Sequence, residues 1–82
     1  MKTLSEIKKE FKKFKSVTVN TILLQEDEGE YFLDVCCTVM DIYGNFDNEF
    51  IEVGIWENEG KAEKHGKMLA TKFNCEYEVS NC

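Results

Sequence analysis

The first fifteen residues carry apolar side chains at helical spacing, with lysines between them. The apolar positions recur every three or four residues, at Leu4, Ile7, Phe11 and Phe14. This spacing places them on one face of a helix, so we expect an amphipathic helix over residues 3–14. Thr3 or Ser5 could cap this helix, and Thr3 and Glu6 have the spacing of a capping box, which satisfies free backbone amides where a helix begins.

The period changes to two after this helix. Side chains expected on one face alternate at Val17, Val19, Thr21 and Leu23 in a first run and at Tyr31, Leu33, Val35, Cys37 and Val39 in a second. Such alternation is typical of half-buried strands, and the two runs predict a hairpin. The stretch between them contains Gly29 among four carboxylates. A glycine flanked by charges favours a solvated turn, because glycine accepts a positive φ without strain.

A third strand, over residues 49–56, follows a second turn around Gly44. The alternating apolar residues of this run, expected on one face, are Ile51, Val53 and Ile55. Three consecutive strands with short turns predict an antiparallel meander. Gly54 interrupts the third strand, which indicates a bulge or a close approach by neighbouring backbone.

Helical spacing returns near the C-terminus, and a short alternating run follows it. The helical stripe consists of Ala62, Gly66, Leu69 and Phe73, with Asn58 as the expected N-cap. Gly66 costs about 1 kcal/mol of helix propensity, so we expect it to permit close packing. The final run, CEYEV, predicts a short strand that faces the core with Cys75, Tyr77 and Val79.

These elements predict one α+β domain spanning residues 1–82, in the order α-β-β-β-α-β. An antiparallel three-stranded meander is joined by a short fourth strand. Each helix has a single apolar stripe, so both helices are expected on one face of the sheet. If the last strand shares the sheet with the third, the connecting helix makes the two parallel. Which edge the last strand joins stays open.

The second face of the sheet is predicted to be mixed rather than polar. If odd positions of the middle strand face the helices, the even ones and their companions on the third strand face away: Phe32, Asp34, Cys36, Thr38, Met40, Phe50, Glu52, Gly54 and Trp56. Exposed aromatics and a methionine with a charged rim are typical of a partner-binding surface. The alternative is that these side chains cover loops or lie beneath a terminus.

Charge is distributed unevenly along the chain. The net charge is −6, and all ten basic residues are lysine. Residues 1–15 carry six lysines and two glutamates, a net of +4, so the remainder carries −10. Eleven carboxylates and no lysine occur from Glu26 to Glu59. Such a segment repels nucleic acid and attracts basic surfaces, although it is also compatible with an acidic surface that only confers solubility.

We therefore hypothesise that acidic and aromatic side chains together form a partner-binding site. Its predicted members are Glu26, Asp27, Glu28, Glu30, Phe32, Asp34, Met40, Phe50, Glu52 and Trp56. The carboxylates would imitate the phosphates that a DNA- or RNA-binding protein expects, and the aromatics would anchor the complex. The expected partner is a protein with a basic surface, and direct contact with nucleic acid or membrane is not expected.

No catalytic constellation is found, so we expect neither an enzyme nor a bound cofactor or metal. The single histidine, His65, lies off the apolar stripe and is expected to be solvated. The cysteines fit no zinc pattern, and neighbours such as Cys36 and Cys37 point to opposite faces of a strand. A small enzyme that uses one of these two thiols is an alternative. The lack of a membrane span or signal peptide predicts a cytoplasmic location with reduced cysteines.

Size, acidity, the lysine-only basic set and the helix-plus-meander pattern resemble small phage-encoded inhibitors of host defence or of nucleic-acid enzymes, such as anti-CRISPR proteins and uracil-DNA glycosylase inhibitors. The resemblance covers overall character and rests on no residue signature. It implies a non-enzymatic protein that blocks a nucleic-acid-handling partner by occupying its basic site. The alternative is a structural or assembly protein that dimerises through the aromatic face of its sheet.

Overall fold

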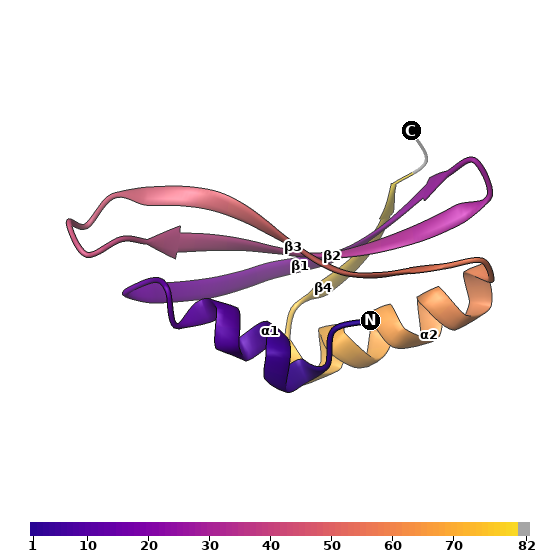
Figure 1. Ribbon diagram of the computed structural model, residues 1–82, viewed down its shortest axis with the longest axis horizontal. Helices are drawn as coiled ribbons and strands as arrows, with labels where there is room; N and C mark the ends of the chain where they lie inside the picture. Colours follow the sequence, from indigo (N-terminus) through magenta and orange to yellow (C-terminus); the bar gives the residue numbers. More distant parts are fainter. Residues whose placement is uncertain (81–82) are drawn as a thin grey trace.

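The computed structural model describes residues 1–80, which form a four-stranded sheet and two helices. The elements are α1 (Leu4–Phe11), β1 (Ser16–Asp27), β2 (Glu30–Met40), β3 (Phe46–Trp56), α2 (Glu59–Phe73) and β4 (Glu76–Ser80). The strands lie in the order β3-β2-β1-β4. Both helices lie on one side of the sheet (Figure 1), which confirms the predicted α+β architecture. The molecule is thin and elongated, with extents of 41 × 26 × 18 Å.

The first helix begins at the predicted cap and ends earlier than predicted. The Thr3 hydroxyl accepts a hydrogen bond from the Glu6 amide at 3.2 Å, and the Glu6 carboxylate accepts one from the Thr3 amide at 3.1 Å. The helix ends at Phe11, because the chain then turns toward the sheet. The Lys15 amide donates to the Met40 carbonyl at 2.9 Å, which attaches the turn to β2 just before β1 begins.

A register irregularity at Asn20 divides β1 into two parts that bury opposite parities. Before it, two odd-numbered valines pack against the core, and after it Ile22 and Leu24 are buried. A bulge inserts one unpaired residue and so changes which side chains face the core. The prediction was therefore wrong for Thr21 and Leu23, which pair with outward-facing residues of β2 and lie on the outer face.

A second irregularity, at Val53, has the same effect on β3. Val53 and Gly54 both fall on the inner face, so the residues that follow exchange the faces predicted for them. Ile55 is 48% exposed on the outer face, and Trp56 packs against the core. A Cβ on Gly54 would lie 3.3 Å from the Cα of Met1, so this glycine marks both a bulge and a close backbone approach, as expected.

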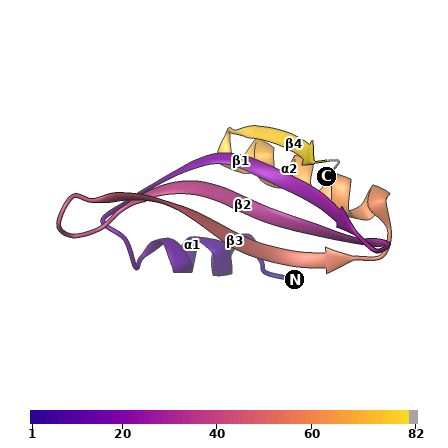
Figure 2. The same cartoon turned by 90° about the horizontal axis from the view of Figure 1, so that it is seen from above.

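The last strand lies beside β1, at the opposite edge of the sheet from β3 (Figure 2). β4 is parallel to β1 and therefore also to β3, as the connection through α2 predicts. Cys75 and Tyr77 pack against the core as expected. Val79 does not, because it lies near the end of this edge strand and is about half exposed.

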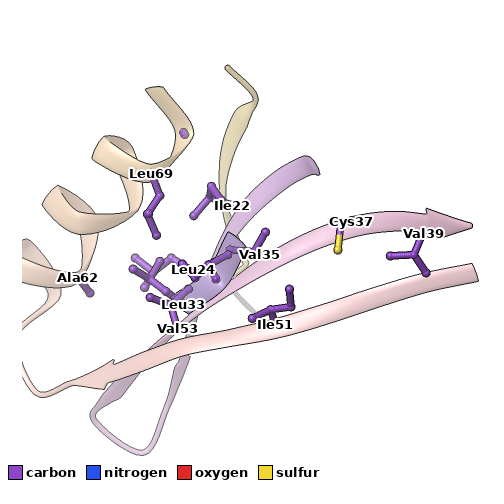
Figure 3. Close-up of a cluster of buried hydrophobic side chains, with 12 residues drawn as sticks. Ile22, Leu24, Leu33, Val35, Cys37, Val39, Ile51, Val53, Ala62 and Leu69 are labelled. Atoms are coloured by element: carbon purple, nitrogen blue, oxygen red, sulfur yellow. The ribbon is translucent and has the colours of Figure 1, made fainter. Parts of the chain in front are cut away.

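The core lies between α2 and one face of the sheet (Figure 3), and Ile7 of α1 adds to it. Its buried side chains are Ile7, Ile22, Leu24, Leu33, Val35, Cys37, Val39, Ile51, Val53, Ala62, Leu69 and Ala70. Odd positions of β2 supply four of them, which confirms the predicted parity of that strand. Gly66 of α2 permits close packing, because a Cβ there would lie 2.7 Å from Cε1 of Tyr77 and 3.0 Å from Cδ2 of Leu33.

Replacing Gly66 with alanine should destabilise the protein, although alanine is the better helix former. The added methyl group overlaps the Tyr77 ring and the Leu33 side chain. Such overpacking costs about 1–3 kcal/mol, whereas the gain in helix propensity is about 1 kcal/mol. Urea unfolding measures the difference, with Lys64→Ala at an exposed position of α2 as the control. A Gly66→Ala variant more stable than the wild type contradicts the close contact.

Candidate functional site

Both helices pack against one face of the sheet, and no helix or strand among residues 1–80 covers the other (Figures 1 and 2). We call this surface the open face. Strand pairing places on it Thr21, Leu23, Phe32, Asp34, Cys36, Thr38, Met40, Phe46, Asn48, Phe50, Glu52, Ile55, Glu76 and Glu78. An antiparallel sheet tolerates an uncovered face when that face is polar. Here the face also carries large apolar side chains.

The apolar side chains gather toward the turn between β2 and β3. Phe46 and Phe50 are 71% and 64% exposed, and Met40 pairs directly with Phe46. The turn itself adds Ile42 and Tyr43, which are 73% and 83% exposed, and it extends beyond the end of α1 (Figure 1). We call these five residues the apolar arm. Three of them, Ile42, Tyr43 and Phe46, were not predicted as site residues.

The turn that carries the arm is ordered by Asp41. Its Oδ1 accepts hydrogen bonds from the amides of Tyr43 and Asn45 at 2.8 and 2.9 Å, and its Oδ2 accepts one from the Asn45 side chain at 3.2 Å. These bonds lower the pKa of the Asp41 carboxyl. Gly44 follows with φ +85°, the positive backbone conformation that this turn requires. The Asp41 carboxylate therefore serves the turn itself.

Carboxylates form a row across the middle of the open face. Asp34 pairs with Glu52 on one side and with Leu23 on the other, and Leu23 in turn pairs with Glu78. We call Glu52, Asp34 and Glu78 the acidic row. Partial burial and the neighbouring Glu52 raise the pKa of Asp34. Asp34, Glu52 and Phe32 also line a depression of about 250 Å³ that reaches the β1–β2 tip.

The basic residues lie away from the open face. The ten lysines fall within residues 2–15 and 61–72, and no strand contains one. The ion pairs found within residues 1–80 are Lys2–Glu10 at 2.7 Å, Lys13–Glu10 at 3.9 Å and Lys67–Glu63 at 2.7 Å. All of them join α1, α2 or the segments beside α1. No carboxylate of the open face takes part, so the molecule is acidic on its sheet side and basic on its helix side.

The carboxylates of the β1–β2 tip lie apart from the apolar arm. Glu26, Asp27, Glu28 and Glu30 are all exposed. Glu28 and Gly29 have φ values of 49° and 81°, which confirms the predicted tight turn. β2 separates this tip from the arm by its whole length, about 33 Å at 3.3 Å per residue. The predicted site residues thus fall at two ends of one face, with the acidic row between them.

Trp56, predicted on the open face, lies on the opposite face. The bulge at Val53 turns its side chain toward α2, where its ring centroid lies 5.3 Å from that of His65. The prediction of a solvated His65 was also wrong: it is half-buried, and its Nε2 is buried without a hydrogen bond to any described residue. Burial lowers the pKa of His65, so the fold favours the neutral imidazole.

The thiols show little sign of nucleophilic chemistry. Cys36 lies on the open face and Cys37 is buried on the other, as expected for neighbours in a strand. Burial raises the pKa of both thiols and of Cys75, which disfavours the reactive thiolate. Within residues 1–80, no cluster of three or more His, Cys, Asp or Glu side chains could hold a metal ion. Cys82 lies outside the described residues.

Neither helix in the described part of the chain is long and apolar enough to cross a bilayer. Comparisons of the chain with protein-family models, with curated proteins and with solved structures found no match. The open face, with its acidic row and apolar arm, is therefore the feature from which a function can be inferred.

Asp34→Asn should stabilise the protein at pH 7. The pKa of Asp34 is raised in the folded state, so folding disfavours the ionised carboxylate, and a neutral amide removes that cost. The advantage should shrink as the pH falls through the folded-state pKa and fade below the ordinary value of 3.8, where the carboxyl is protonated in both states. Urea unfolding at pH 7 and at a pH below 3.8 tests this, and Glu57→Gln at an exposed position is the control. A less stable Asp34→Asn at pH 7 contradicts the burial of the carboxylate.

Acidification from pH 7.5 to 5.5 should destabilise the wild type through His65. The pKa of His65 is lowered in the folded state. The stability that the neutral imidazole contributes is therefore fully present above the ordinary pKa of 6.5 and is lost as the pH falls below 6.5. His65→Phe keeps a ring against Trp56 without titrating, and its unfolding free energy should vary less over this range. An identical pH dependence in the two proteins argues against a buried imidazole.

Proposed function

We propose that this protein is a non-enzymatic inhibitor whose open face occupies the basic site of a nucleic-acid-handling protein. The observation that supports this most is that carboxylates without an ion pair to any described residue share one sheet face with exposed aromatic side chains, and no described element covers that face. The partner class is a host-defence protein or a DNA or RNA enzyme, the kind of target that small acidic phage proteins block. The carboxylates take the place of the nucleic-acid phosphates.

The acidic row presents three carboxylates in a line across the sheet, as an extended anion would. Neighbouring strands lie about 5 Å apart, so Glu52, Asp34 and Glu78 span roughly 14 Å across three strand spacings. Residues 1–15 and 59–73 hold all ten lysines and four glutamates, a net of +6, which leaves −12 for the rest of the chain. A partner with clustered lysine and arginine is attracted to the sheet side and repelled by the helix side, which orients its approach.

The apolar arm supplies the contacts that charge alone does not. Phe46, Phe50 and Tyr43 are large and exposed, and Tyr43 lies in the turn that the Asp41 carboxylate orders by hydrogen bonds. Aromatic side chains of this kind are enriched among the residues that contribute most to interface affinity, whereas exposed charges mainly set association rate and specificity. The arm therefore anchors the complex once the acidic row has steered it.

A homodimer through the open face is the second candidate, because an exposed apolar arm also suits self-association. Face-to-face packing would enclose two copies of the acidic row in one interface, however, and like charges at close range oppose this. Sedimentation at micromolar concentration and low salt separates the candidates. A monomer is expected, whereas a stable dimer that shields Phe50 from solvent favours the assembly role.

Neutralising the open face should weaken partner capture strongly, while removing the same number of charges elsewhere should not. The test variant is D34N/E52Q/E76Q/E78Q, and the matched control, E10Q/E57Q/E59Q/E63Q, removes the same charge from the two helices and the turn between β3 and α2. Immobilised wild type is incubated with a bacterial lysate, and the bound proteins are identified. The test variant should bind them at least about tenfold more weakly, because steering and complementary charge are lost together.

The bound proteins should be nucleic-acid-binding proteins, and duplex DNA or RNA should displace them because both ligands compete for one basic site. Binding should weaken as salt rises from low to physiological concentration. Capture that is insensitive to salt, restricted to acidic proteins, or equal for the test variant and the control contradicts the proposal.

A further inference from the structure

The edge of β3 is unpaired within residues 1–80, apart from one backbone hydrogen bond from the N-terminal segment. β3 forms one edge of the sheet (Figure 2), and no strand among residues 1–80 pairs with its outer side. Within residues 1–80, the N-terminal segment reaches this edge at Val53, whose carbonyl accepts the Lys2 amide at 2.7 Å. Residues 46–52 extend beyond that contact. An exposed edge of this length is a template for another extended chain.

The hydrogen bonds around β3 identify the backbone groups that face outward. The Met40 carbonyl accepts from Lys15, on the side away from β3, so Met40 and its partner Phe46 do not exchange ladder bonds. The Asn48 amide donates to the Asp47 side chain at 2.8 Å instead of to β2. Because pairs in an antiparallel ladder alternate between bonded and non-bonded, the outward-facing set is Phe46, Asn48, Phe50 and Glu52. The amides of Phe50 and Glu52 thus point away from the sheet.

Several features that often protect an edge strand are missing from this segment. Residues 46–52 contain no proline, no lysine and no bulge, whereas β4, at the other edge, has only five residues. The charges that are present, on Asp47, Glu49 and Glu52, are all negative. Two copies of this edge would bring six carboxylates together, so the edge disfavours self-pairing and favours a basic strand.

We propose that β3 binds its partner by accepting an extended, lysine- or arginine-rich segment as a fifth strand along residues 46–52. This binding mode rests on the proposed function and adds to it the kind of partner segment that β3 recognises. The backbone amides and carbonyls of Phe50 and Glu52 supply hydrogen bonds, and alternate basic side chains of the added strand meet Glu52 and its neighbours on the open face. Phe50, at the edge of that face, packs against the aliphatic part of a basic side chain beside it.

A nine-residue peptide that alternates lysine with threonine tests the edge directly, and a glutamate–threonine peptide is the charge control. Amide hydrogen exchange is measured on the full-length protein with and without each peptide. The lysine peptide should slow exchange at Phe50 and Glu52 by at least about tenfold, because these amides become bonded. Ile51, whose amide is already in the ladder with β2, should stay protected throughout and serves as the internal standard.

Two substitutions at one position separate backbone from side-chain recognition. Phe50→Pro removes an outward amide without removing a bond to β2, which an edge strand accommodates. Phe50→Ala removes the aromatic ring and keeps the amide. The proline variant should lose peptide binding to a greater extent than the alanine variant, and circular dichroism confirms that both are folded. Where Phe50→Pro fails to fold, the exchange measurement on the wild type decides.

The outcomes also separate this inference from the proposed function. Peptide binding that perturbs the side chains of Asp34 and Glu52 but leaves exchange at the β3 edge unchanged overturns strand addition and leaves binding by the open face intact. Absence of lysine-peptide binding at low salt, or equal binding of the glutamate peptide, overturns the inference. The lysate experiment with the variant D34N/E52Q/E76Q/E78Q then tests the proposed function independently.

Discussion

Packing of both helices against a single face of the sheet is the constraint on which the rest of this structure depends. The side chains at odd positions of β2, and those packed beside them, are buried beneath α1 and α2. Burial of apolar area is the dominant favourable contribution to folding. Residues 1–80 contain no further helix or strand that covers the second face. The open face, the separation of lysines from carboxylates, and the exposed β3 edge all follow from this arrangement.

The two bulges decide which side chains belong to each face. Without the irregularity at Val53, Ile55 would be inside and Trp56 outside; with it, Trp56 contacts His65 and the open face gains an aliphatic side chain in place of an indole. Asn20 has the same effect in β1 and buries Ile22 and Leu24 in the half of the strand that α2 covers. The residues available to a partner are thus set by local backbone geometry as much as by composition.

Much of this fold could be predicted from the sequence, because its signals are local. The caps at Thr3 and Asn58, the turn glycines and the parity of β2 all depend on residues close together in the chain. Bulge positions could not be predicted fully: Gly54 signalled one, but Asn20 carries no comparable signal. The edge taken by β4 depends on long-range packing. Within the candidate site, the alternation of side chains along β2 and β3 predicted Phe32, Asp34, Met40, Phe50 and Glu52. It did not predict Ile42, Tyr43 and Phe46, because the sequence around them indicates only a turn.

Nuclear magnetic relaxation with cationic and anionic paramagnetic cosolutes tests most directly whether the free protein exposes an acidic sheet face. The cation should relax protons of Asp34, Phe50 and Glu78 more strongly than the anion does, and the order should reverse for the lysines of α1. Core protons of Leu33 and Leu69 should be little affected by either. Equal relaxation by the two cosolutes on the sheet side, or protection of Phe50 from both, would contradict an open and negatively charged face.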